Sequence, residues 1–153
     1  MKVKGIYLMF KAGFHLSLFF AFVFFHPIAF CTEVISKTRQ LTFEGVRSGE
    51  GYFSASGEKM VYQSENHEGN PFYQIYLLDL KSGENKLVST GNGKTTCAWI
   101  HPTEKLVLFS STHLDSNASL KQKLEFSERE IGKARKYSWD YDPNYDVFSK
   151  DLT

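Results

Sequence analysis

The sequence predicts an all-β fold made of small antiparallel sheets, because the same strand pattern occurs twice. Segment 52–64 returns as 99–111 at an offset of 47 residues. Segment 73–80 returns as 145–152 at an offset of 72 residues, so the second copy contains 25 additional residues. Turn residues separate the apolar runs within each copy. A repeat of this length is typical of units that bury their faces by stacking on neighbouring units.

The first copy contains four short expected strands, at residues 51–54, 59–64, 72–80 and 85–89. Gly57 supplies the first turn, because glycine adopts positive φ at no steric cost. The loop around Gly69-Asn70-Pro71 and the turn at 81–84 separate the later strands. The second copy has expected strands at residues 97–100, 105–111 and 145–152, and a further strand is expected at 37–43.

The run Leu106-Val107-Leu108-Phe109 is apolar without alternation. A strand with one wet face alternates apolar and polar residues, whereas a strand covered on both faces is continuously apolar. Each sheet in a stack of small sheets is covered on both sides. The pattern therefore favours a β-propeller, with blades of four antiparallel strands, over a single sandwich.

The first copy resembles the WD40-like (PD40) repeat of TolB-type β-propellers. The matching residues are Tyr52-Phe53-Ser54-x-x-Gly57-x-Lys59-Met60-Val61-Tyr62-x-Ser64 and Ile75-Tyr76-x-x-Asp79-Leu80-x-x-Gly83. The resemblance covers residues 37–153. It departs from the family at the turn, which is Ser54-Ala55-Ser56-Gly57 in place of Ser-Pro-Asp-Gly, and Glu104 replaces the glycine in the second copy.

The resemblance implies an exported, often periplasmic, protein whose ring of blades binds other proteins or small ligands. The family also includes propellers fused to peptidase domains. Propellers have about four to eight blades, whereas this chain has about two, so the ring is incomplete. We expect the N-terminal piece of a longer protein. The alternative is assembly of several chains into one ring.

The N-terminus has the pattern of a secretory signal peptide at residues 1–31. Lys2, Lys4 and Lys11 form a basic start, and residues 14–31 carry no charged side chain. Export to the periplasm is therefore expected, with cleavage before Thr32. The alternatives are a membrane anchor at residues 14–31, near the lower length limit for a span, and a lipoprotein at Cys31.

The charge balance after the signal does not suggest a nucleic-acid partner, and none is expected. Of the 18 Lys and Arg residues, 15 follow residue 31, and so do all 17 Asp and Glu residues. The formal charge of this part is therefore about −2. Nucleic-acid binding requires a clustered basic face, and this charge balance does not point to one. With Cys31 removed, Cys97 is a lone cysteine, expected to be a small buried apolar residue.

Two groups of side chains suggest metal sites. Asp140, Asp142 and Asn144 alternate along the chain like the ligands of a calcium loop. Tyr145 stands where that loop needs glycine, so an Asx-type turn at residues 142–144 is the competing interpretation. The second group is Cys97, His101 and His113. Seven or eight strand residues place the two histidines roughly 25 Å apart, too far for one metal ion to bridge, so no metal site is expected there and His101 is interpreted as a turn residue. No cofactor is expected.

The additional residues of the second copy form an insertion at about 112–140. A short helix is expected within residues 119–136, with Ser127 and Glu130 as its capping box. Its C-terminal end offers cations and aromatic rings for partner contact: Lys133, Arg135, Lys136, Tyr137 and Trp139. Long inserted loops often carry function. The alternative is an insertion that is exposed to solvent and has no binding role.

The sequence contains neither Gly-x-Ser-x-Gly nor His-Glu-x-x-His, so no nucleophile set is recognised. We therefore expect a non-catalytic, exported β-propeller module for protein–protein interaction that meets membrane only through its N-terminal segment. The alternative is an accessory propeller of an exported peptidase or hydrolase whose catalytic domain is absent from this chain. A third interpretation is a non-functional remnant.

Overall fold

The structure, a computed structural model, describes residues 36–133 and 141–153. The chain divides into residues 1–39 and 40–153, and all elements below belong to the second part. They are β1 (Ser48–Phe53), β2 (Lys59–Ser64), β3 (Gln74–Asp79), β4 (Asn85–Leu87), β5 (Thr95–Ile100), β6 (Leu106–Ser111), α2 (Ala118–Glu130) and β7 (Asp146–Asp151). The predicted signal peptide, residues 1–31, lies outside the described residues.

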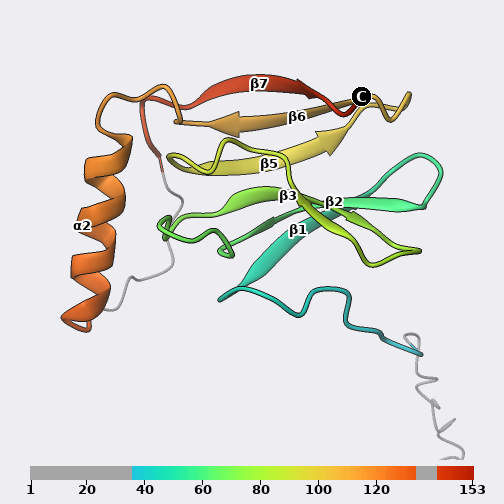
Figure 1. Cartoon of the computed structure of the whole chain (residues 1–153), viewed down its shortest axis with the longest axis horizontal. Helices are drawn as coiled ribbons and strands as arrows, with labels where there is room; N and C mark the ends of the chain where they lie inside the picture. Colours follow the sequence, from blue (N-terminus) through green and yellow to red (C-terminus); the bar gives the residue numbers. More distant parts are fainter. Residues whose placement is uncertain (1–35, 134–140) are drawn as a thin grey trace, which may run out of the picture. The chain divides into compact units, whose positions relative to one another are not determined.

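The strands form two antiparallel sheets in which each strand pairs with its neighbour in sequence (Figure 1). Sheet A has the order β1-β2-β3-β4, and sheet B has the order β5-β6-β7. The sequence predicted an all-β propeller, and the described residues form a mostly β fold of two antiparallel sheets with one helix.

The strand registers correspond between the two sheets at the sequence offsets. Lys59 pairs with Asp79 in sheet A, and Leu106 pairs with Asp151 in sheet B. These pairs differ by the offsets of 47 and 72 residues. The register of β6 against β7 is therefore that of β2 against β3.

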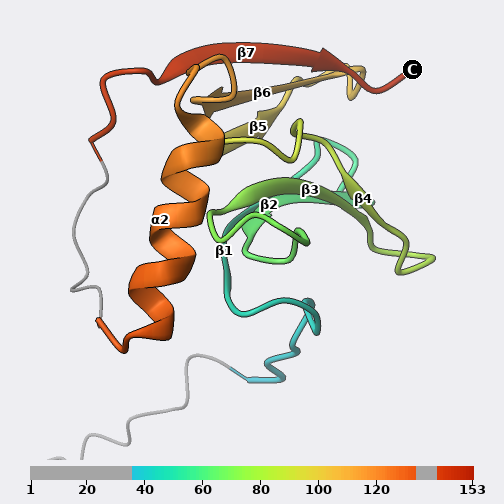
Figure 2. The same cartoon turned by 60° about the vertical axis from the view of Figure 1, so that its left-hand side comes forward.

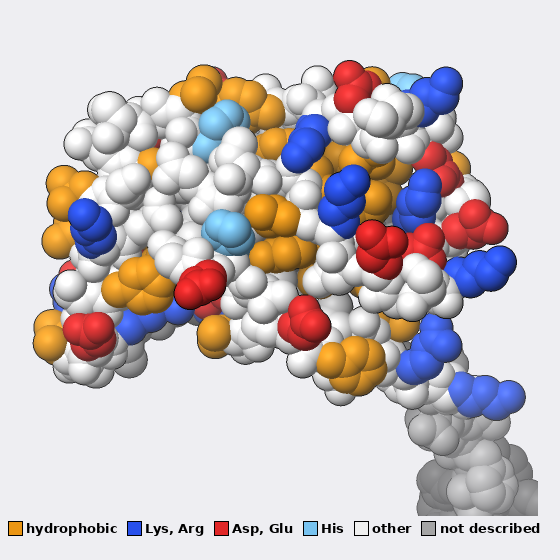
Figure 3. Space-filling model, in the orientation of Figure 1, with side chains coloured by type: hydrophobic (Ala, Val, Ile, Leu, Met, Phe, Trp, Pro, Cys, Tyr) orange, Lys and Arg blue, Asp and Glu red, His pale blue; other side chains and the backbone are white. Residues whose placement is uncertain are grey.

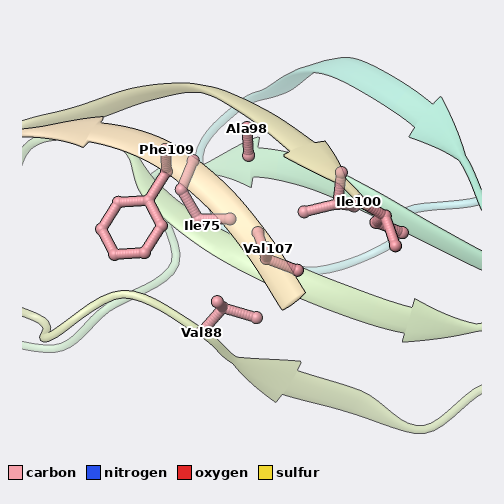
Figure 4. Packing of buried hydrophobic residues seen from close by; sticks show 7 residues of the cluster. Ile75, Val88, Ala98, Ile100, Val107 and Phe109 are labelled. Atoms are coloured by element: carbon pink, nitrogen blue, oxygen red, sulfur yellow. The ribbon is translucent and has the colours of Figure 1, made fainter. Parts of the chain in front are cut away.

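The two sheets stack through a shared apolar core (Figure 4). Its buried side chains come from β2 and β3, from the residue directly after β4, and from β5 and β6: Val61, Ile75, Val88, Ala98, Ile100, Val107 and Phe109. Val107 and Phe109 point into this core, whereas Leu108 between them is 39% exposed. In the described part of the chain, the apolar run of β6 is thus covered on one face, not on both as its pattern predicted.

The other face of sheet A carries a second apolar cluster, and one residue of a segment that was predicted to be a strand packs against it. Met60, Tyr62, Tyr76 and Leu78 form a second cluster, against which Leu41 packs. Residues 36–43 contain no strand, so the strand predicted at 37–43 is wrong. A strand needs a neighbouring backbone to satisfy its N–H and C=O groups, and this segment contributes a side chain to the face of the sheet instead.

Each sheet contains an irregularity in its first strand. The register shifts between Thr96 and Trp99 in β5, where Cys97 has a φ of 54°. A bulge inserts an unpaired residue into one strand, and here that residue is exposed. The prediction that Cys97 is buried is therefore wrong.

The turns at the ends of β1 and β5 meet each other. Gly57 has a φ of 73°, and Glu104 adopts the corresponding position with a φ of 56°. A left-handed residue other than glycine costs about 1–2 kcal/mol. The Glu104 carboxylate accepts a hydrogen bond from the backbone N–H of Ser56 at 2.7 Å, which lowers the pKa of Glu104. The residue that replaces glycine thus links the turns of the two sheets.

The insertion contains the short helix that its sequence predicts. α2 begins at Ala118 and ends at Glu130. Asn117 is its N-cap, and Ser127 lies inside the helix, where its hydroxyl donates to the Lys123 carbonyl at 3.1 Å. The predicted capping box of Ser127 and Glu130 is therefore wrong.

Candidate binding surface

The loops that join β2 to β3 and β4 to β5 meet the start of the insertion at one end of the strands. Figures 1 and 2 show α2 standing beside this end of the sheets. We call it the insertion end. The turns that follow β1, β3 and β5 lie at the opposite end of the strands.

A buried glutamine fixes the loop between β4 and β5. Gln74 has no exposed surface. Its side-chain amide donates to the carbonyls of Gly93 at 2.9 Å and Tyr73 at 2.8 Å. Its side-chain oxygen accepts from the Ser89 hydroxyl at 2.8 Å and the Gly91 N–H at 3.1 Å. Every polar atom of this side chain is therefore used to hold the backbone.

Helix α2 is attached to these loops through polar side chains. Gln122 is buried, and it accepts from the Gly93 N–H at 3.3 Å and donates to the Gly69 carbonyl at 3.1 Å. Arg129 donates to the Pro71 carbonyl at 2.8 Å. The helix thus contacts both the loop between β2 and β3 and the loop between β4 and β5.

A buried carboxylate joins the second half of α2 to sheet A. Glu65 is 6% exposed. It accepts from Arg47 Nε at 2.8 Å and from Arg129 Nη1 at 3.2 Å. Since Arg129 also pairs with Glu125 at 3.0 Å, two arginines and two carboxylates form one network. Charge-assisted bonds of this kind are stronger than neutral ones.

A second buried carboxylate joins the first half of α2 to the segment before β7. Asp142 lies 2.7 Å from Lys121 Nζ and 3.4 Å from Lys94 Nζ. Lys121 also binds Asp115 at 2.7 Å. Burial alone would raise the pKa of Asp142, but hydrogen bonds from Lys121 and the Asn144 N–H, with the charges of both lysines, lower it to about 2.

This arrangement makes the calcium candidates poor cation ligands. Two ammonium groups already face the Asp142 carboxylate. Asn144 donates to Asp142 Oδ1 at 3.2 Å through its backbone N–H, as the Asx-type interpretation predicted. Asp140 lies outside the described residues. Within residues 36–133 and 141–153, no group of three or more His, Cys, Asp and Glu side chains is placed to hold a metal ion.

The two histidines of the other candidate group have separate local partners. His101 Nδ1 bonds Thr103 Oγ1 at 2.8 Å inside its turn. His113 Nδ1 bonds Ser111 Oγ at 2.9 Å, and its ring lies 4.3 Å from the ring of Phe148. The structure does not bring them together.

Of the predicted partner-contact residues, Lys133 is exposed and pairs with Glu128 at 2.6 Å. Arg135, Lys136, Tyr137 and Trp139 lie outside the described residues. Sequence reasoning missed the anchors Gln122 and Arg129. A signal for them existed, because residues 118, 122, 125 and 129 follow helical spacing and share one face of α2.

A small hollow of about 190 Å³ lies at the opposite end, lined by Lys59, Leu77, Asp79, Glu84 and Lys86. Its lining combines cations and carboxylates around one leucine. The lining contains no serine, cysteine or histidine, the usual side chains of nucleophilic catalysis.

No protein-family model matches this chain, and no curated protein is similar to it. The resemblance to TolB-type propellers therefore stays a prediction, as do export and the periplasmic location. Across the part of the chain that the structure describes, no helix has the length and apolar character needed to cross a membrane.

Replacing Asp142 with asparagine should destabilise the protein by about 2 kcal/mol at pH 7. The folded-state pKa of about 2 lies below the ordinary value of 3.8, and each pKa unit corresponds to about 1.4 kcal/mol. The stabilisation is present above pH 3.8 and is lost as pH falls toward 2. The measurement is urea unfolding of both proteins at pH 7 and pH 3.

The control is Asp146→Asn, which neutralises an exposed carboxylate at the start of β7 and should change the free energy of unfolding by less than about 0.5 kcal/mol at pH 7. A difference between Asp142→Asn and the unchanged chain that stays constant from pH 7 to pH 3 would contradict the prediction.

Proposed function

We propose that this chain is a non-catalytic, exported binding module of the β-propeller type. The proposal is supported by two stacked antiparallel sheets whose strand registers correspond. It is also supported by the outer face of sheet B, where Trp99, Leu108 and Val147 are 46%, 39% and 72% exposed. Apolar residues at such positions suit the stacking of a further blade.

The protein partner binds at the insertion end in this proposal. The observation that carries it is the attachment of α2 by buried polar contacts at Gln122, Glu65 and Asp142. An insertion that only extended into solvent would carry exposed ion pairs, which contribute little to stability. The ion pairs that attach α2 have buried carboxylates instead. A helix held in this way presents a rigid surface, which lowers the entropic cost of binding.

Photo-crosslinking tests the proposal. A benzophenone amino acid at Leu114, which is 73% exposed at the insertion end, should link the exported chain to a different protein. The matched control places it at Lys81, which is exposed in the turn at the opposite end. Equal labelling from both positions, or no adduct with another protein from Leu114, would overturn the proposal.

A further inference from the structure

Helix α2 turns its apolar side away from the protein. Its buried residues are Ala118 and Gln122. Leu120, Leu124 and Ile131, which directly follows the helix, are 54%, 55% and 78% exposed. At 3.6 residues per turn, these three lie within an arc of about 40° opposite the buried face. We call them the α2 stripe.

This orientation is the reverse of an ordinary surface helix, whose apolar side faces the core. Here the polar side faces the protein because it supplies the contacts of Gln122, Arg129 and Lys121 to the loops. Hydrophobic side chains accordingly gather over α2 at the left of Figure 3. Contiguous exposed apolar residues mark interaction sites.

The spacing of the stripe fits a second helix. Positions 120, 124, 127 and 131 follow the alternating four- and three-residue steps of a coiled-coil seam. Ser127 occupies the third position, so three of the four are apolar. In an antiparallel pair of α2 helices, Leu120 of one copy lies opposite Ile131 of the other.

The charges beside the stripe fit the same antiparallel pair. Lys121 and Lys123 flank its first half, and Glu128 and Glu130 flank its second half. Antiparallel pairing places Lys123 of one copy beside Glu130 of the other, twice in each dimer. A parallel pair would place Lys123 beside Glu128 instead. Such flanking pairs set partner choice and orientation.

We propose that the α2 stripe binds the α2 stripe of a second copy of this chain, antiparallel. The inference goes beyond the proposed function and does not depend on it. The contact spans about two heptads. It therefore belongs to the small, transient class of interfaces, below about 1,200 Å² of total buried area.

Sedimentation velocity of the full chain over a concentration series tests the proposal. Leu124→Glu should raise the dimer dissociation constant at least about ten-fold, because it places a carboxylate in the apolar seam. Leu114→Glu makes the same change at a leucine outside the stripe that is more exposed than Leu124, 73% against 55%, and should leave dimerisation unchanged. Both positions are exposed, so urea midpoints at monomeric concentration should match the unchanged chain.

A charge exchange tests the orientation. Lys123→Glu should weaken the dimer, and the double variant Lys123→Glu/Glu130→Lys should restore it to within about three-fold, because the antiparallel pairs re-form with reversed signs. In a parallel dimer the double variant would stay weak. That result, an equal effect of Leu114→Glu, or a chain that remains monomeric would overturn the proposal. So would binding of the stripe to anionic phospholipid vesicles in place of a second copy.

Failure of this test is distinguishable from failure of the proposed function. The benzophenone at Leu114 reports an adduct with a different protein, whereas the α2 variants report association of the chain with itself.

Discussion

Phe109→Ala is expected to lower the free energy of unfolding by about 3–5 kcal/mol, the range for emptying a buried phenylalanine site. Phe109 is 4% exposed in the core between the two sheets, and its ring lies 6.3 Å from that of Phe148. The two sheets are held together there by side-chain packing, so the cavity that the substitution leaves weakens their stacking directly. Urea unfolding measures the change.

The matched control is Phe43→Ala, since Phe43 is 79% exposed. Its effect should stay within about 0.5 kcal/mol. Equal effects at the two positions would show that the two sheets do not share this core. A loss of this size is a large fraction of the 5–15 kcal/mol that typically separates folded from unfolded chains.

Gln74→Leu should cost about 3 kcal/mol although it keeps the volume of the side chain and raises its apolar content. The glutamine accepts from the Gly91 N–H and the Ser89 hydroxyl. Leucine leaves the Gly91 N–H without this acceptor in a part-buried site, and each unsatisfied group costs about 1–3 kcal/mol. The measurement is the urea midpoint.

Gln40→Leu is the control for this change, because Gln40 is exposed and bonds only within its own segment in the described contacts. A stabilised Gln74→Leu variant would contradict the prediction and would mean that burial of apolar surface outweighs the hydrogen bonds of the amide. The result therefore also tests whether the insertion end depends on its buried polar groups.

The regular part of the fold could be predicted because its causes are local. The strand expected at residues 59–64 forms at Lys59–Ser64, since apolar residues and turn glycines within a few positions determine it. The offsets also matched the registers, because a repeated pattern places corresponding residues opposite corresponding partners.

The rest of the fold and the attachment of α2 could not be predicted, because they depend on contacts between residues far apart in the sequence. Gln122 bonds the Gly69 carbonyl, 53 residues away in sequence, and a backbone carbonyl carries no sequence signal. The same reason applies to residues 37–43, whose pattern suits a strand but whose pairing requires an available edge. Cys97 followed an apolar pattern, and the bulge that exposes it depends on the neighbouring strand.

The insertion also changes the entropy of forming sheet B. Residues 65–73 connect β2 to β3, whereas residues 112–145 connect β6 to β7. Closing the longer connection costs about 1 kcal/mol more, because the loss of chain freedom grows with the logarithm of loop length. The bonds of Lys121 to Asp142 and of Gln122 to Gly93 divide that connection into shorter loops. The contacts that attach α2 therefore also limit the conformational freedom that β7 must lose to join its sheet.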